Sequence, residues 1–327
     1  MKLYLLLYAD DTVVFAESPA SLQQALNCMN DYCELWQLHI NTDKTKVVIF
    51  SRGKLRSKPV FYLNNALLEA VDDFSYLGVM FNYNGKFGKT KKHLTDQARK
   101  AMFSVMTKVK KLCLPVDIQL QLFDSMLSPI LLYGSEVWGY ENIAIISQFQ
   151  LKFYKYMLKL KMSTPTIMVM GELGACPIEN KIYSNMLNFW GRLISGKQDK
   201  ISSILYRTMY NLHEKGIVHC EWVAKIKSIL DNIGCTEYWI MQSIPNLNYF
   251  KSKVKSSLYD QYLQNWSSNV YNSSKCLNYR IYKIELKLEN YLLCLPKNLA
   301  IALCKFRCLN SNLPVEKGRF YGIERAK

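Results

Sequence analysis

The spacing of apolar residues changes near residue 83, and this change constrains the fold more than any other feature of the chain. Before it, short runs of β-branched, aromatic and leucine residues alternate with turn-forming residues, a pattern typical of strands. After it, apolar residues recur every three to four positions over long stretches, which is typical of helices. The sequence therefore predicts an α+β chain that is mainly α.

This change separates a partial antiparallel sheet over residues 1–82 from a mainly helical remainder that begins at residue 83. The strands are expected at 3–8, 12–16, 46–50, 60–63, 66–71 and 76–81. The helices are expected at 18–38, around 94–109 and 118–127, and near 141–161, 179–195, 220–232, 252–266 and 296–309. Pro129 should break or kink its helix. The polar stretches 195–200 and 267–275 are candidate linkers.

Two adjacent aspartates, Asp10 and Asp11, lie between the first two predicted strands in the run LLLYADDTVVFA. Aspartate is common in turns because its side chain bonds to its own backbone, so ordinary turn chemistry is one interpretation. Metal binding is the other, because hard cations such as Mg²⁺ prefer carboxylate oxygens and a hairpin fixes where those oxygens point. In phosphoryl transfer, two such ions about 3.5–4 Å apart stabilise the attacking and leaving oxygens.

The chain is strongly basic, with 42 Lys and Arg against 26 Asp and Glu and a formal net charge of +16. This charge favours a polyanionic partner, nucleic acid first and an anionic membrane surface second, although an indifferent basic surface is an equal alternative. The charge is densest over residues 85–111, with nine Lys and Arg against Asp96 alone. No apolar run approaches the ~18 residues of a membrane span, so we expect no membrane insertion.

Ten cysteines occur singly on apolar stretches, without the C-x-x-C spacing of zinc or redox sites. They predict buried thiols in a reducing compartment, and hence an intracellular protein that is not secreted. Cys304 and Cys308 lie one helical turn apart, and we expect them to be core residues rather than metal ligands. The apolar start of the chain is predicted to be a strand rather than a signal peptide.

The YADD run at residues 8–11, between apolar strands, resembles the catalytic hairpin of reverse transcriptases. Further blocks follow in the order found in the non-LTR (LINE-type) retrotransposon branch of that family: NTDKTKVVIF at 41–50, FSYLGV at 74–79, LLYGSEVW at 131–138 and a last block within 305–320. The block at 74–79 resembles the primer-side hairpin of the family. The resemblance implies that residues 1–82 correspond to the later part of the polymerase palm. It likewise implies a thumb over 83–165 and a downstream helical region over 166–327.

The resemblance also implies roles for single residues. Asp10 and Asp11 would be catalytic ligands of Mg²⁺, with Mn²⁺ as an alternative, and Lys44 would neutralise the leaving pyrophosphate. The nucleic-acid contacts would be made by Tyr8, Tyr76, Leu77, Gly78, Lys89, Lys91, Lys92, Arg99 and Lys100. A solvated lysine, a plain strand end and a solvated helix face remain the alternatives for Lys44, for 76–78 and for the basic run. Lys152, Lys155 and Lys159 would extend the basic track.

The expected partners are an RNA template and a DNA primer. The family's site contains a further aspartate on a strand well before the hairpin, whereas this sequence starts nine residues before Asp10. We expect no counterpart of the zinc-binding module that follows in the family, because no cysteine occurs after Cys308 in this sequence. We therefore expect a fragment of an RNA-directed DNA polymerase that is inactive alone. Either Leu3, Leu5 and Leu7, or Tyr4 and Leu6 on the opposite face, should be exposed at an edge that promotes self-association.

Two other classes of function stay open from the residues alone. A non-catalytic basic protein that binds RNA or DNA would keep the basic helices and retain the aspartates as turn residues only. A helical scaffold protein would have no affinity for nucleic acid at all.

Overall fold

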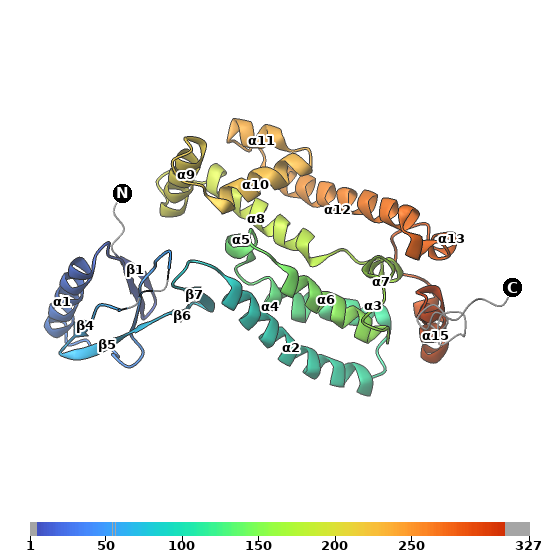
Figure 1. The fold of residues 1–327 in the computed structure, drawn as a ribbon, viewed down its shortest axis with the longest axis horizontal. Helices are drawn as coiled ribbons and strands as arrows, with labels where there is room; N and C mark the ends of the chain where they lie inside the picture. Colours follow the sequence, from blue (N-terminus) through green and yellow to red (C-terminus); the bar gives the residue numbers. More distant parts are fainter. Residues whose placement is uncertain (1–4, 54, 56, 311–327) are drawn as a thin grey trace. The chain divides into compact units, whose positions relative to one another are not determined.

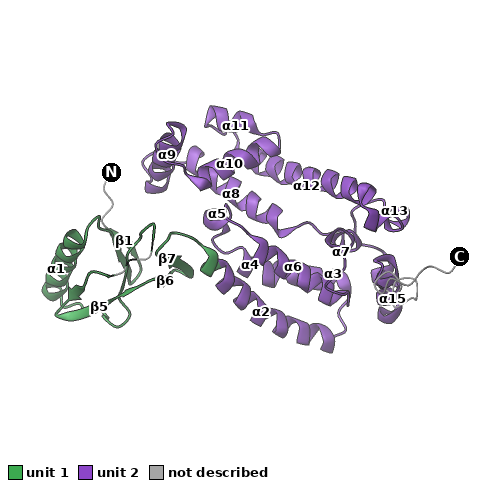
Figure 2. Cartoon of the chain, in the orientation of Figure 1, with its two compact units in different colours: residues 1–90 green, residues 91–327 purple. Residues whose placement is uncertain are grey.

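A computed structural model of the chain describes residues 5–53, 55 and 57–310. The chain divides into two compact units, residues 1–90 and 91–327, which we call unit 1 and unit 2 (Figure 2). Unit 1 contains every strand in the described part of the chain, and unit 2 is helical. The predicted α+β, mainly α class is confirmed. Predictions for Leu3 and Tyr4 and for residues 311–320 lie outside the described residues.

Unit 1 begins with the predicted hairpin, formed by β1 (Leu5–Tyr8) and β2 (Asp11–Val14) in antiparallel pairing. Helix α1 (Pro19–Leu35) follows. Ser18 caps its first turn, because the Ser18 hydroxyl accepts a hydrogen bond of 3.2 Å from the Ser21 backbone N–H. Pro19 fits the first helical position, because the backbone N–H that proline lacks would have no partner within the helix there. These signals are local, which is why the start of α1 was predictable.

The core of unit 1 lies between α1 and three short strands, β3 (Lys46–Val48), β4 (Phe61–Leu63) and β5 (Ala66–Val71). The strand order is β3-β5-β4, with β4 antiparallel and β3 parallel to β5. The Gln23 side chain bonds to both the N–H and the carbonyl of Tyr62, which attaches α1 to β4. The buried apolar residues of this core are Leu26, Val47, Phe61, Leu63 and Leu68.

The strand predicted at 76–81 is instead a second hairpin, β6 (Asp73–Tyr76) and β7 (Val79–Asn82). Leu77 and Gly78 form its two-residue turn with φ values of 48° and 77°. Positive φ at both central residues is the geometry of a type I′ turn, whose twist matches that of the two strands. The antiparallel pairs of unit 1 are therefore spread over three small sheets rather than one.

Unit 2 is built from helices (Figure 1). The first of them, α2, starts at Gly88, just before the boundary between the units. In order they are α2 (Gly88–Lys111), α3 (Val116–Leu122), α4 (Ser128–Leu131), α5 (Ser135–Trp138), α6 (Ala144–Met157), α7 (Thr166–Leu173), α8 (Ile178–Ser195), α9 (Ile201–Glu214), α10 (Glu221–Asn232), α11 (Thr236–Met241), α12 (Leu247–Asn272), α13 (Tyr279–Tyr282), α14 (Tyr291–Cys294) and α15 (Lys297–Arg307).

Most of the predicted helices are confirmed, and the deviations have local causes. Before Pro129 the helix widens into a π turn (Phe123–Leu127), as expected for a proline that cannot donate to the preceding turn. The linker predicted at 267–275 is wrong, because α12 continues to Asn272. Trp266 and Val270 are buried one helical turn apart within this polar stretch. None of the described helices combines the length and hydropathy needed to cross a membrane.

Helix α8 is central to the core of unit 2 and packs against α5, α10 and α12. Trp190 on α8 is fully buried, stacks on Trp239 with 6.1 Å between ring centroids, and donates a hydrogen bond of 2.8 Å to the hydroxyl of Tyr206. The one polar atom of this indole therefore has a partner, as a buried tryptophan requires.

A buried ionic network joins α7 to α15. The Glu172 carboxylate is fully buried, and both of its oxygens accept hydrogen bonds of 3.0–3.2 Å from the Arg307 guanidinium. The Tyr291 hydroxyl also donates to Glu172, and Arg307 lies 3.2 Å from Glu289, which pairs with the buried Lys283. This paired arrangement compensates the desolvation of the buried charges.

The cysteines are less uniform than predicted. All ten are free, and Cys304 and Cys308 are buried core residues, as expected. The prediction that the thiols are buried is wrong for Cys28, Cys113 and Cys294, which are exposed. Cys28 and Cys294 lie on the solvent side of a helix, and Cys113 lies just after one. Apolar neighbours in the sequence do not reveal which side of a helix a residue occupies.

Candidate catalytic hairpin and nucleic-acid interface

The acidic pair lies at the tip of the first hairpin. Tyr8 pairs with Asp11 across the strands, so Ala9 and Asp10 form a two-residue loop. Ala9 has φ of 51°, a left-handed conformation that residues with a Cβ rarely adopt. Asp10 and Asp11 are both exposed, and Tyr8 beside them is 63% exposed. The tip of the hairpin, residues 8–11, therefore presents two carboxylates and one aromatic ring to solvent.

This donor set fits a hard divalent cation in its chemistry but is small. Two carboxylates offer the oxygen ligands that Mg²⁺ prefers. Within residues 5–53, 55 and 57–310, no three acidic, histidine or cysteine side chains come together as a metal site. The structure thus brings Asp10 and Asp11 together and adds no third ligand from the described residues.

The hairpin has an exposed apolar side. Within the part of the chain that the structure describes, β1 pairs with β2 alone. Leu5 and Leu7 are 45% and 67% exposed, as the first of the two predicted alternatives for this edge requires. Apolar side chains next to unpaired strand edges favour association with another chain. Self-association through this edge stays a prediction.

Lys44 lies in the turn before β3. Its backbone N–H donates a hydrogen bond of 3.0 Å to the Asn41 side chain, which forms the turn, and its side chain is exposed. Among the described residues no ion pair joins Lys44 to Asp10 or Asp11. The local turn is therefore defined, whereas the pairing of Lys44 with a developing negative charge stays a proposal.

Tyr76, Leu77 and Gly78 lie at the tip of the second hairpin. Tyr76 is half-buried as the last residue of β6, and Leu77 and Gly78 are exposed in the turn. A left-handed φ is uncommon for a residue as large as leucine, and such residues are enriched at functional sites. The three residues therefore form a compact tip rather than the straight strand end of the alternative interpretation.

The two lysines at the start of α2, Lys89 and Lys91, both form ion pairs but differ in burial. Lys89 forms an ion pair with Asp73, and this lysine, by its hydrogen bond, holds the pKa of the Asp73 carboxyl below its usual range. Lys91 is 4% exposed and its ammonium lies 2.6 Å from Glu141, so it supports the fold. We therefore remove Lys91 from the predicted phosphate contacts.

The remaining predicted contacts on α2 are accessible. Lys92, Arg99 and Lys100 are exposed, and Arg99 forms a surface pair of 2.7 Å with Asp96 one turn away. Exposed pairs of this kind contribute little free energy, so Arg99 can exchange Asp96 for a phosphate at small cost. Lys92, Arg99 and Lys100 therefore stay predicted phosphate contacts, and their side chains are accessible.

The second basic helix differs from its prediction at one position. Lys152 and Lys159 are exposed, but Lys155 is buried, and its ammonium donates a hydrogen bond of 2.6 Å to the carbonyl of Met162. Desolvation lowers the pKa of Lys155. Lys155 therefore does not belong to the basic track.

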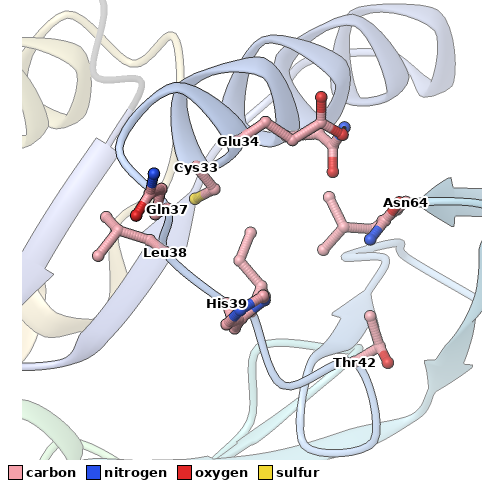
Figure 3. A pocket seen from close by; sticks show the side chains of 10 residues that line it. Cys33, Glu34, Gln37, Leu38, His39, Thr42 and Asn64 are labelled. Atoms are coloured by element: carbon pink, nitrogen blue, oxygen red, sulfur yellow. Dashed lines mark hydrogen bonds between the residues drawn. The ribbon is translucent and has the colours of Figure 1, made fainter.

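Sequence reasoning missed two features. Tyr156 on α6 is 48% exposed, with the ammonium of Lys110 on α2 lying over its ring. A pocket of about 470 Å³ also lies beside the end of α1, where Glu34 and His39 are among its lining residues (Figure 3). It contains none of the predicted site residues. Spacing alone signals neither feature, because each depends on elements brought together by folding.

Comparison with known proteins finds relatives of this chain, and the family match covers the segment that contains the first hairpin. Residues 1–81 match the model of the family "Reverse transcriptase (RNA-dependent DNA polymerase)". An uncharacterised transposon-derived protein of Caenorhabditis elegans is 31% identical over 139 residues, covering 41% of this chain and 48% of that protein. An RNA-directed DNA polymerase from the mobile element jockey of Drosophila melanogaster is 27% identical over 143 residues, covering 40% and 15%.

A jockey polymerase from Drosophila funebris is also similar, at 25% identity over 146 residues that cover 40% of this chain and 15% of the relative. No solved structure matches the chain. The chain spans about half the length of the nematode relative and less of the jockey proteins. These matches confirm the resemblance drawn from the motifs: the chain is similar to RNA-directed DNA polymerases of the mobile element jockey, and its residues 1–81 match the reverse transcriptase family.

Proposed function

We propose that this chain acts as part of an RNA-directed DNA polymerase of a non-LTR retrotransposon. In this proposal the first hairpin holds catalytic metal through Asp10 and Asp11, and the exposed basic face of α2 binds the phosphates of an RNA template and a DNA primer. The observation that carries the proposal is the tight hairpin with two exposed carboxylates at its tip, inside the segment that matches the reverse transcriptase family.

Asp10 and Asp11 would hold Mg²⁺, or Mn²⁺ in its place, through their carboxylate oxygens. The metal would stabilise the attacking and leaving oxygens of nucleotidyl transfer. Lys44 would supply positive charge to the leaving pyrophosphate. Tyr8 and the turn formed by Tyr76, Leu77 and Gly78 would contact the primer. An intracellular location, favoured by the free thiols, belongs to the same proposal.

We expect the isolated chain to extend no primer, because the described residues join only two carboxylates where a two-metal site needs more ligands. The measurement is primer extension on an RNA template by the purified chain, with Mg²⁺ or Mn²⁺. Metal-dependent extension that Asp10→Ala and Asp11→Ala abolish would contradict this expectation.

Phosphate binding is the part of the proposal that the isolated chain can test. The affinity for an RNA–DNA hybrid, measured by fluorescence anisotropy, should fall linearly with salt on logarithmic axes. Replacing Lys92 and Lys100 by Gln should reduce that slope by about one for each lost phosphate contact. The matched control replaces the exposed Lys227 and Lys275 by Gln and should leave the slope unchanged. A flat salt response of the wild-type chain would overturn the proposal.

A second candidate function is a non-catalytic protein that binds RNA or DNA. It is favoured by one observation, that the described residues add no third ligand to the acidic pair. The two candidate functions differ in whether Asp10 and Asp11 bind a metal ion. If Asp10→Ala/Asp11→Ala removes Mn²⁺ binding measured by electron paramagnetic resonance, the polymerase-derived site is supported. If the wild-type hairpin binds no Mn²⁺ while nucleic-acid affinity is retained, the non-catalytic function is favoured. A helical scaffold would bind no nucleic acid.

A further inference from the structure

We infer that unit 2 carries a binding site for single-stranded nucleic acid, formed by α2 and α6, in which Phe103 and Tyr156 stack on bases while neighbouring lysines bind phosphates. The inference rests on the proposed function for the class of ligand. It adds the strandedness of that ligand and two aromatic contacts that the basic track alone does not supply.

The first observation is a line of side chains along α2. Lys92, Arg99, Phe103 and Lys110 are separated by seven, four and seven residues, which places them on one side of a helix with 3.6 residues per turn. All four are exposed, and Phe103 is 62% exposed. Between Lys92 and Lys110 the helix rises about 27 Å. A phenylalanine in this position is not part of the apolar face, where Leu94, Ala98, Val105 and Val109 are buried.

The second observation joins this line to α6. The Lys110 ammonium lies 5.7 Å from the centroid of the Tyr156 ring, and α2 and α6 run alongside each other (Figure 1). Tyr156 remains 48% exposed beside this cation. Lys152, one turn before Tyr156, and Lys159, just beyond the end of α6, are exposed as well. Aromatic and cationic groups from the two helices thus share one surface.

The third observation is the sign of the charge. Residues 97–116 and 142–171, which include the C-terminal part of α2 and all of α6, contain no Asp or Glu. The acidic residues at the borders of these stretches that pair with lysine or arginine are Asp96, Glu141 and Glu172. The helical faces around Phe103 and Tyr156 therefore contribute only positive charge, which attracts a polyanion.

Exposed rings among cations select single strands. Phosphate contacts alone are sufficient to grip a duplex and need no aromatic partner. In a single strand each base has an accessible π-face, and stacking on an aromatic side chain adds affinity that tolerates any sequence. In a duplex these faces are already stacked. The aromatic residues of this surface should therefore matter for single strands and not for duplexes.

The test uses the full chain with a fluorescent poly-U RNA or poly-dT DNA oligonucleotide, and separately with an RNA–DNA hybrid of equal length. We expect Tyr156→Ala and Phe103→Ala each to weaken single-strand binding about fivefold or more, the lower end for loss of one stacked base. The hybrid affinity should change less than about twofold, because its bases are already stacked. Tyr156→Phe keeps the ring and should bind like the wild type.

The matched control is Tyr271→Ala. Tyr271 is an exposed tyrosine of the same unit, 70% exposed, with the Arg280 guanidinium 5.4 Å from its ring centroid. Its loss should leave both affinities unchanged. A second measurement does not depend on the variants: photocrosslinking of the wild-type chain to an oligonucleotide containing 5-iodouracil should label the peptides that contain Phe103 and Tyr156.

The outcomes separate this inference from the proposed function. A wild-type chain that binds neither single strands nor hybrid at low salt overturns both. A wild-type chain that binds, but whose Tyr156→Ala and Phe103→Ala variants bind single strands normally, overturns the stacking site alone. Equal losses for single strands and hybrid would show a general phosphate contact and would also overturn it.

Discussion

The two units of the chain hold their candidate functional residues by different means. In unit 1 the residues lie in turns, at the tips of the two hairpins and before β3, and the core of the unit has five buried residues. In unit 2 they lie on the exposed faces of α2 and α6, whose opposite faces are buried at Leu94 and Val105 of α2 and at Phe153 of α6. Turn geometry therefore positions the proposed chemistry, and helix packing positions the proposed nucleic-acid contacts.

Because of this difference, we expect the two units to be destabilised by different kinds of substitution. A small core tolerates little loss, since the free energy of unfolding grows with the buried apolar surface. A large helical core tolerates more, but its buried charges are expensive to leave without partners. Changes in the two cores should consequently act on separate parts of the chain.

The largest effect is expected from Glu172→Ala in unit 2. The change removes the fully buried acceptor of the Arg307 guanidinium and of the Tyr291 hydroxyl. Breaking a buried ion pair typically costs about 3–5 kcal/mol, and Arg307 would keep only its contact with Glu289. Urea unfolding followed by circular dichroism measures the loss, since most of the helical signal comes from unit 2.

The matched control for this change is Asp124→Ala, which removes the exposed Asp124–Lys181 pair in the same unit, a contact of 2.6 Å. It should cost less than about 1 kcal/mol. If Glu172→Ala is no more destabilising than Asp124→Ala, the ionic network does not attach α15 to α7 in the way described above.

The next effect is expected from Leu63→Ala in unit 1. Leu63 is 2% exposed on β4, and truncating a buried leucine costs about 2–5 kcal/mol. In so small a core this loss should open most of unit 1. Hydrogen–deuterium exchange resolved by peptide should show faster exchange over residues 17–82 and unchanged exchange in α8 and α12.

Leu67→Ala provides the comparison on the neighbouring strand. Leu67 is 64% exposed on β5, so its truncation should stay within about 0.5 kcal/mol. Equal effects of the two substitutions, or faster exchange throughout unit 2 after Leu63→Ala, would contradict the division into two units with separate cores.

The local elements of unit 1 could be predicted from the sequence, because their signals are short in range. The acidic centre between apolar runs predicted the first hairpin, and Ser18-Pro19 predicted the start of α1. The residue pattern predicted one strand at 76–81, because Leu77 continues an apolar run and a leucine with left-handed φ has no sequence signal. The hairpin there was anticipated only by the resemblance of 74–79 to the primer-side hairpin of the reverse transcriptase family.

Long-range partners explain what the sequence could not reveal in unit 2. Lys91 and Lys155 have the pattern of solvated lysines, yet they are buried, with Glu141 and the carbonyl of Met162 as their partners. The end of α12 is polar, but Trp266 and Val270 pack inside and override its weak helix propensity. The acidic pair was found by its residue type, whereas Tyr156 became a candidate only through its contact with Lys110.

A smaller effect is expected from Ala9→Gly at the tip of the first hairpin. Glycine removes the cost of about 1–2 kcal/mol for a left-handed residue with a Cβ, while its greater freedom in the unfolded chain offsets about 0.5–1 kcal/mol. The hairpin should therefore become slightly more stable, by about 1 kcal/mol or less. Slower amide exchange of residues 5–14 measures this gain.

Ala66→Gly is the matched control, because Ala66 lies in β5 without a positive φ. There the same substitution should destabilise by about 0.5–1 kcal/mol. Opposite signs at the two alanines support the strained tip. Destabilisation at both positions would mean that the tip adopts a relaxed turn in solution.

The smallest effect is a dependence on pH at the end of unit 1. The pKa of Asp73 is lowered in the folded chain, mainly by its hydrogen bond with Lys89. The stability from this contact is therefore fully present above the unfolded pKa of about 3.9 and is lost as the pH falls through the lower folded value. Asp73→Asn should increase amide exchange in β6 and β7 at about pH 6, and this difference from the wild type should disappear in strong acid.

Lys89→Met separates the ion pair from other roles of Asp73. If the pair produces the pH dependence, adding Asp73→Asn to the Lys89→Met variant should cause no further increase in exchange at about pH 6, because the lysine that stabilises the carboxylate is already gone. A pH-dependent effect of Asp73→Asn that persists in the Lys89→Met variant would assign the effect to Asn82, which also donates a hydrogen bond to Asp73. Exchange rates normalised to the unfolded chain at each pH distinguish the two results.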